Sequence, residues 1–173
     1  VRMTDTVRDA IATEIALLTQ VVDFPEAPFG YGSDVWCERD VDANVEEIEV
    51  AMAVLGEGGL ASVQNEFSPR FRSSRDELEF CGERGIAFLP WSPLGGTGAH
   101  SKEVGQAYPA FHEIGLAHGV SPQQVVLAWE LSLGEHVIPI PGASRPESIT
   151  DSAQAAHLEL TDAELEAIEA QFC

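Results

Sequence analysis

Short apolar runs alternate with helix-forming segments along most of this chain, and this alternation constrains the fold more than any other feature. Apolar runs at residues 60–64, 86–90 and 137–140 are each followed by a loop of Gly, Pro or Ser and then by a helix-forming segment. Alternating β and α units of this length form parallel strands joined by right-handed helical crossovers. We therefore expect an α/β fold with about three parallel strands, adjacent in chain order, and flanking helices.

Capping residues mark where several of the helices begin. Asn44 precedes an apolar periodic run, Ser121 and Pro122 occupy the N-cap and first helical positions of another, and Thr161 stands at capping-box spacing from Glu164. The expected helices cover residues 44–55, 74–84, 103–118 with an interruption near 109, 121–133, 146–155 and 161–172.

The first 43 residues do not follow this alternation. Apolar side chains recur at helical spacing over residues 4–20, which predicts an amphipathic helix, and Pro and Gly punctuate a loop over residues 23–43. We therefore divide the chain into an N-terminal segment, residues 1–43, and an α/β unit, residues 44–173. The whole chain of 173 residues is shorter than the roughly 250 residues of a complete eight-stranded (β/α) barrel.

The charge of the chain excludes some classes of partner. It has 29 acidic and 9 basic residues, a formal charge of −20. Such a surface repels phosphate backbones and anionic lipid, so we expect neither nucleic acid nor a membrane as a partner. The acidic residues are spread along the chain, which is typical of a solvated surface and also of adaptation to high salt.

Cysteine and histidine positions predict no metal site. The three cysteines are widely spaced, which favours a reducing cytoplasm over a disulfide framework, and His112 and His118 do not share a helix face. We find neither the pattern of a secretory signal peptide nor an apolar run of the roughly 18 residues that cross a bilayer.

The loop after the third apolar run has the features of a phosphate site. The chain passes through Gly142, Ser144 and Arg145 before a helix expected to begin at Pro146. Amide groups at a helix start suit a phosphate, and the hydroxyl and guanidinium groups add further donors. The same pattern also fits a capping serine followed by a surface arginine.

The loop after the second run offers similar chemistry. Ser92, Leu94, Gly95 and Gly96 present backbone amides directly after a buried strand. A glycine-rich segment is also a common flexible connector. Barrel folds bind phosphate after their last two strands, so two such loops on adjacent strands favour a phosphate-bearing ligand.

Several segments resemble aldo-keto reductases, in the order and at the spacing found in that family. They are LASVQNEFSP, ERGIAFLPWSPLGG, AHGVSPQQVVLAWELS, VIPIPGASRPESI and LELTDAELEAIEA. The resemblance covers about Gly59 to Cys173, and it implies a partial (β/α) barrel that corresponds to the C-terminal half of the family's fold, with the N-terminal half absent.

The resemblance implies a nicotinamide dinucleotide, with NADPH as the expected cofactor. It places Gln64, Asn65 and Phe67 at the nicotinamide, with the Phe67 ring stacked on it where many relatives have Tyr. It assigns the pyrophosphate to the second loop and the adenosine 2′-phosphate and adenine to the third. The residues concerned are Ser92, Pro93, Leu94 and Gly95 in the second loop, and Gly142, Ser144, Arg145 and Glu147 in the third.

The family's catalytic Asp, Tyr, Lys and His lie on the half of the barrel that finds no match here. Lys102, Tyr31 and Tyr108 stand outside the family's motifs, so no catalytic residue is assigned. We expect an NADP(H)-binding oxidoreductase homologue without the catalytic set. A non-catalytic or artificial half-barrel fragment, and an assembly protein with the reductase half as scaffold, are the alternatives. Open strand edges also predict an oligomer of identical chains that covers them.

Overall fold

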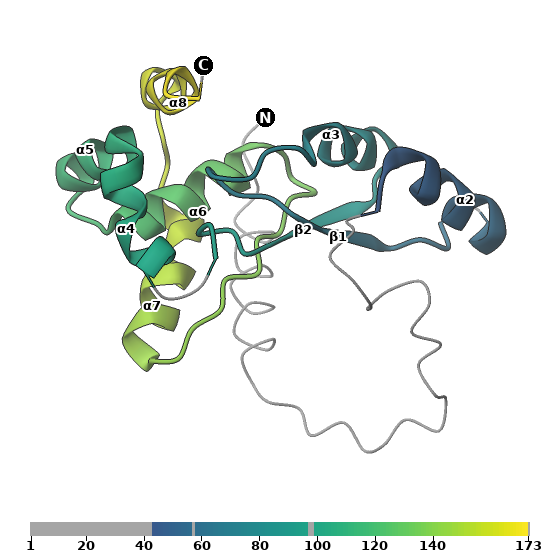
Figure 1. Cartoon of the computed structure of the whole chain (residues 1–173), viewed down its shortest axis with the longest axis horizontal. Helices are drawn as coiled ribbons and strands as arrows, with labels where there is room; N and C mark the ends of the chain where they lie inside the picture. The colour runs from purple at the N-terminus through teal and green to yellow at the C-terminus, as the bar shows by residue number, and fades with distance from the viewer. Residues whose placement is uncertain (1–42, 57, 97–98, 173) are drawn as a thin grey trace.

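The structure, a computed structural model, describes residues 43–56, 58–96 and 99–172 (Figure 1). The helix predicted over residues 4–20 and the loop predicted over 23–43 lie outside these residues. The elements follow in the order α2 (Val45–Leu55), β1 (Ser62–Glu66), α3 (Arg75–Arg84), β2 (Ala87–Trp91), α4 (Ala99–Ala107), α5 (Pro109–His118), α6 (Pro122–Ser132), α7 (Pro146–Gln154), the 3₁₀ turn η1 (Ala155–His157) and α8 (Asp162–Ala170).

The sheet has two parallel strands, β1 and β2, with Gln64 paired to Leu89. Residues 137–140 run parallel to β2 on its other side, where Phe88 bridges Val137 and Trp91 bridges Ile140. The predicted order and direction are confirmed, but the third segment forms isolated bridges and not a strand.

The third segment bonds β2 through alternate amides, as a parallel strand does, and prolines occupy the positions between them. The Ile138 amide donates to the Phe88 carbonyl at 2.8 Å and the Ile140 amide donates to the Pro90 carbonyl at 3.0 Å. Between and after these amides stand Pro139 and Pro141, which have no N–H to donate. Their side of the segment, away from β2, therefore has no amide to offer a further strand.

Helices cover one face of the two strands. Val63, Asn65, Phe88 and Pro90 are buried, whereas the residues between them are half-buried or exposed. Figure 1 shows α2 and α3 on one side of the strands, and the inward residues of α3, Leu78 and Cys81, are 1% and 0% exposed as the sequence predicts. We call the other side, with Ser62, Gln64, Glu66, Ala87, Leu89 and Trp91, the open face.

Helix α6 lies at the centre of the core, with seven consecutive buried residues from Gln124 to Glu130. The Trp129 ring stacks on Phe67 at a centroid distance of 5.9 Å and meets Phe111 edge-on at 5.9 Å. Burial of Val125, Val126 and Trp129 is confirmed.

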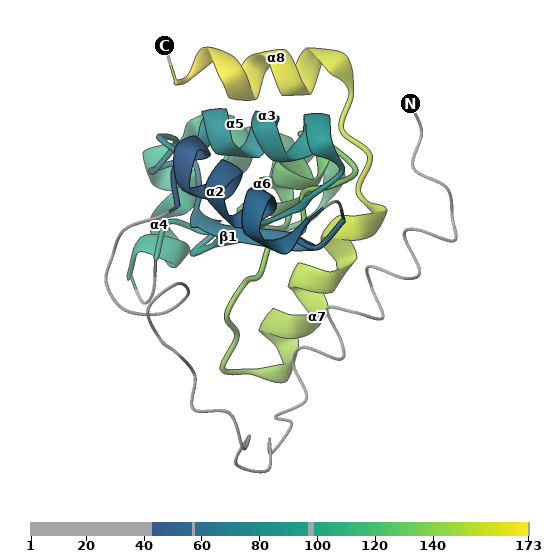
Figure 2. The same ribbon diagram turned by 90° about the vertical axis from the view of Figure 1, so that its right-hand side faces the viewer.

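Helix α8 is fastened to this core through Arg72. The Arg72 guanidinium lies 4.1 Å from the Phe172 ring centroid and bonds a carboxylate oxygen of Glu169 at 2.9 Å. The other oxygen of that carboxylate accepts from Trp129 Nε1 at 2.9 Å. Figure 2 shows α8 on the same side of the molecule as α5, with which it is in contact.

Most predicted helix limits are confirmed by capping geometry. Asn44 and Thr161 both form capping boxes, and Ser121 accepts from the Gln124 amide. The expected interruption near Pro109 occurs at Tyr108, between α4 and α5. Helix α4 begins earlier than predicted, at Ala99, because no helix-breaking residue follows Gly98 in the first turn.

Candidate functional site

The ends of the parallel segments bring the predicted loops to one edge of the sheet. Strands β1 and β2 and residues 137–140 all run in the same direction, so the loops after Glu66, Trp91 and Ile140 leave from the same edge. In open and closed α/β sheets, ligands bind outside the carboxyl ends of the strands. The arrangement therefore groups the loops that the sequence singled out.

Gln64 and Asn65 point to opposite sides of β1. Gln64 is exposed on the open face, whereas Asn65 is 0% exposed on the helix-covered face. The Asn65 side-chain amide donates to the Ala43 carbonyl at 2.8 Å, which fixes the entry to α2. Only Gln64 of this pair is placed to meet a ligand on the open face.

Phe67 is part of the aromatic core. Its ring is 0% exposed and is in contact with Trp129 and Phe88, the latter at a centroid distance of 6.3 Å. In this position the ring has no free face for a nicotinamide. Alternation along the strand could have shown this, because Val63, Asn65 and Phe67 share one side.

The loop after β2 has an unusual backbone. Ser92 has a φ of 51°, the only positive φ of a residue other than Gly in the part of the chain that the structure describes. The Gly95 amide donates to the Ser92 carbonyl at 2.8 Å and closes a turn around the buried Pro93. A strained conformation of this kind costs about 1–3 kcal/mol and is concentrated at ligand-binding loops.

The start of α7 is open to solvent. Residues 142–147, which include Gly142, Ser144, Arg145 and Glu147, are all exposed. Arg145 is the N-cap with extended backbone (φ −137°, ψ 143°), and no side chain caps the first turn. The amides of this turn and the Arg145 side chain are therefore available to an anion, although Glu147 adds a negative charge beside them.

Two arginines in the described part of the chain lack an ion pair. Arg72, Arg75 and Arg84 each pair with a glutamate at 2.8–3.3 Å. Arg70 and Arg145 pair with none of the described residues, and both are exposed. In a chain with a charge of −20, cations that pair with none of the described residues at two strand-end loops are candidate anion contacts.

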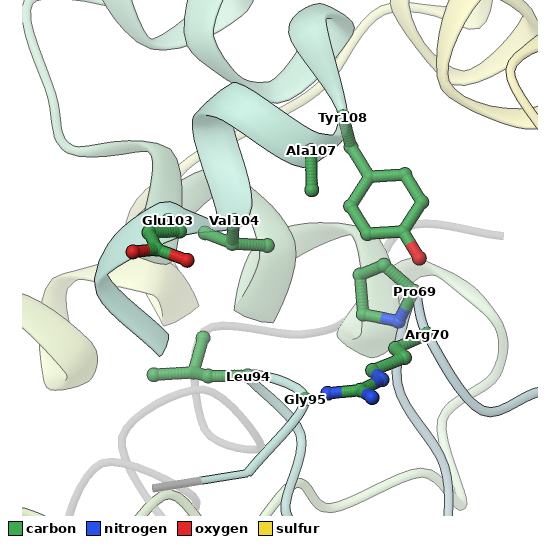
Figure 3. Close-up of a pocket in the computed structure, with 8 residues that line it drawn as sticks. All are labelled: Pro69, Arg70, Leu94, Gly95, Glu103, Val104, Ala107 and Tyr108. Atoms are coloured by element: carbon green, nitrogen blue, oxygen red, sulfur yellow. The ribbon is translucent and has the colours of Figure 1, made fainter. Parts of the chain in front are cut away.

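Arg70 was missed by the sequence analysis. It follows Pro69 in the loop after β1, so the argument used for Arg145, a cation in a strand-end loop, also points to it. It lines a cavity of about 240 Å³ with Leu94 and Gly95 (Figure 3).

Metal and membrane features are absent from what the structure describes. Residues 43–56, 58–96 and 99–172 hold no group of three or more His, Cys, Asp or Glu placed to bind a metal ion. Within the same residues, every helix is too short or too polar to cross a bilayer.

Comparison with known proteins accounts for this arrangement. The model of the aldo/keto reductase family matches residues 42–171. The chain belongs to the aldo/keto reductase family. This family match confirms the resemblance drawn from the strand-end motifs.

Individual relatives of this family member match more than half of the chain. An uncharacterized oxidoreductase of Schizosaccharomyces pombe is 34% identical over 102 residues, which are 59% of this chain and 32% of the relative. An aldo-keto reductase from Klebsiella pneumoniae in complex with NADPH superposes with a TM-score of 0.66 at 22% identity, over 76% of this chain and 46% of that one. A variant of Gox0644 in complex with NADPH gives a TM-score of 0.58 at 26% identity, over 75% and 44% of the two chains. The chain thus spans about a third of this curated relative and less than half of these solved structures.

Proposed function

We propose that this aldo-keto reductase binds NADPH at the loops that follow β1, β2 and residues 137–140. The observation that carries the proposal is Arg145, a cation that pairs with none of the described residues, at the open N-terminus of α7. A guanidinium beside free helix amides suits the adenosine 2′-phosphate, which NADH lacks. The NADPH-bound relatives described above support the same cofactor.

The other predicted residues divide between the parts of the dinucleotide. Gln64, exposed on the open face, would meet the nicotinamide amide. The turn from Ser92 to Gly95 would hold the pyrophosphate, with the buried Pro93 fixing its shape. Gly142, Ser144, Arg145 and Glu147 would meet the adenosine end. Asn65 and Phe67 would act from behind the strand, by fixing its position, and not by contact.

The reaction class of the family is hydride transfer between the cofactor and a carbonyl compound, and we propose that this chain on its own performs little of it. Proton transfer to the carbonyl oxygen requires a positioned acid, which contributes a factor of roughly 10² to 10⁴ in rate. Tyr108, the tyrosine in the described part of the chain, stands at the α4–α5 junction, and its ring packs on Phe111 and Phe172. That position belongs to no catalytic motif of the family.

The test of cofactor choice is Arg145→Glu. Wild-type protein should bind NADPH more tightly than NADH in fluorescence titrations. The variant places a carboxylate beside the 2′-phosphate, so the preference should fall by about tenfold or more while NADH affinity changes little. Arg75→Glu is a control, because it makes the same charge change on a half-buried arginine that is already paired with Glu79 at the start of α3.

An unchanged NADPH-to-NADH ratio in Arg145→Glu would show that the 2′-phosphate lies elsewhere. Turnover is tested separately with reactive aldehydes at low and at molar salt. Sustained NADPH oxidation that is lost in Tyr108→Phe would contradict the proposed lack of catalysis.

A further inference from the structure

A cavity of about 240 Å³ lies between the loop after β1, the loop after β2 and helix α4 (Figure 3). Its walls are mostly apolar and include Pro69, Leu94, Val104 and Ala107. The cavity adjoins the turn proposed for the pyrophosphate and shares Leu94 and Gly95 with it, but half of its lining comes from α4 and from Tyr108 after it, which have no role in that proposal. Its ligand is therefore a separate question.

Arg70 supplies the cavity's positive charge. Its guanidinium extends along Gly95, where a Cβ added to the glycine would lie 3.6 Å from the Arg70 Cβ (Figure 3). The guanidinium has no ion-pair partner among the described residues, although acidic residues outnumber basic ones by 29 to 9 in the chain. An arginine kept free of carboxylates in so acidic a protein is available to an external anion.

The opposite wall limits the charge of that anion. Glu103 lies on α4, across the cavity from Arg70, and the Tyr108 hydroxyl points toward the Pro69–Arg70 side (Figure 3). A pyrophosphate placed inside the cavity, and not on the backbone amides of the Ser92–Gly95 turn beside it, would be repelled by the carboxylate of Glu103 and would bury charge against the Leu94 and Val104 side chains. A ligand with one negative end and an apolar body avoids both penalties.

We propose that this cavity binds a small carboxylate with an apolar body. The carboxylate accepts from the Arg70 guanidinium, with the Tyr108 hydroxyl, which points toward the Pro69–Arg70 side, as a second donor. The body packs on Leu94, Val104 and Ala107. A hydroxyl or amino group at the far end of the ligand would be matched by Glu103.

Benzoate is a suitable probe, because it has one carboxylate and a body of the required size. We expect the full chain without NADPH to bind benzoate saturably in ligand-observed NMR titrations at constant ionic strength. Benzyl alcohol, which lacks the charge, and inorganic phosphate, which lacks the apolar body, should each bind at least about tenfold more weakly.

Two variants test the cavity from different sides. Arg70→Gln removes the charge but keeps hydrogen-bond donors, and it should weaken benzoate by about tenfold. Ala107→Leu fills the exposed rim of the cavity without changing charge, and it should abolish binding even if Arg70→Gln folds poorly. Arg75→Gln, on an arginine paired with Glu79, is the matched control and should leave benzoate affinity unchanged.

The proposal is overturned if benzoate does not saturate, if benzyl alcohol or phosphate binds as tightly, or if Ala107→Leu or a folded Arg70→Gln binds benzoate like wild type. Each titration is made without NADPH, so these results do not depend on whether the dinucleotide site exists.

Discussion

Glu130 gives the sharpest prediction about stability. Its side chain is 0% exposed in the middle of α6, and neither carboxyl oxygen has a hydrogen-bond partner among the described residues. Burial raises the pKa of this carboxyl well above its usual value of 4.5. The side chain is therefore held uncharged in the folded protein over a pH range in which the unfolded chain ionises.

The number of protons bound in the folded and unfolded states gives the sign of the pH dependence of stability. Between pH 4.5 and the raised pKa, the folded state binds one more proton than the unfolded state. The free energy of unfolding should therefore fall by about 1.4 kcal/mol for each pH unit in this range. The stability contributed by Glu130, relative to its value at high pH, is fully present below pH 4.5 and is lost as the pH rises to the pKa of Glu130 in the folded state.

Two substitutions separate ionisation from polarity. The side chain in Glu130→Gln stays neutral at every pH. The difference in free energy of unfolding, wild type minus variant, should therefore fall by about 1.4 kcal/mol for each pH unit. Glu130→Leu removes an unsatisfied buried polar group from a site of similar volume and should stabilise the protein by about 1–3 kcal/mol near neutral pH.

The assay is urea unfolding followed by tryptophan fluorescence at a series of pH values above 4.5. Glu166→Gln, on the exposed side of α8, is the control and should give a curve parallel to wild type. Parallel curves for wild type and Glu130→Gln over the same range would refute the reasoning, because they would mean that Glu130 ionises alike in both states.

Three further predictions follow from the packing and the surface. Arg72→Ala removes the contacts with Phe172 and Glu169 that fasten α8, and it should lower the free energy of unfolding by about 1–3 kcal/mol in the same urea assay. The pKa of Glu164 is lowered below 4.5, above all by the hydrogen bond that the Thr161 amide donates to it. Ionised Glu164 therefore stabilises the fold above pH 4.5, and this stabilisation is lost as the pH falls through the pKa of the folded state. Glu164→Gln should therefore be less stable than wild type near neutral pH, with a difference that shrinks in acid. Among the described residues β1 pairs on one side only, with β2; this edge predicts self-association, and sedimentation velocity that shows only monomer at all concentrations would contradict it.

Local signals in the sequence predicted the elements well because each has a physical cause within a few residues. Asn44, Ser121 and Thr161 accept hydrogen bonds from first-turn amides, so the helix starts follow directly from residue type. The third strand could not be judged in the same way, because its regularity depends on contacts with β2, which is distant in the sequence. The Ile138 and Ile140 amides both bond β2, yet the segment forms only isolated bridges, which the apolar run alone does not express.

The candidate site was harder to predict because side-chain direction decides it. Gln64 and Asn65 are neighbours in the sequence, yet Gln64 is exposed, whereas Asn65 is buried and donates a hydrogen bond to the Ala43 carbonyl. Phe67 carries an aromatic ring suited to stacking, but the core occupies both of its faces. Glu130 could not be found at all, because a glutamate between Trp129 and Leu131 does not by itself indicate burial.

Direct titration of the full chain with NADPH by isothermal calorimetry tests the central claim most directly. The account predicts saturable binding of one NADPH per chain, tighter than that of NADH under the same conditions. The absence of saturable heat with NADPH, at low and at molar salt, in protein shown to be folded by circular dichroism, would contradict it.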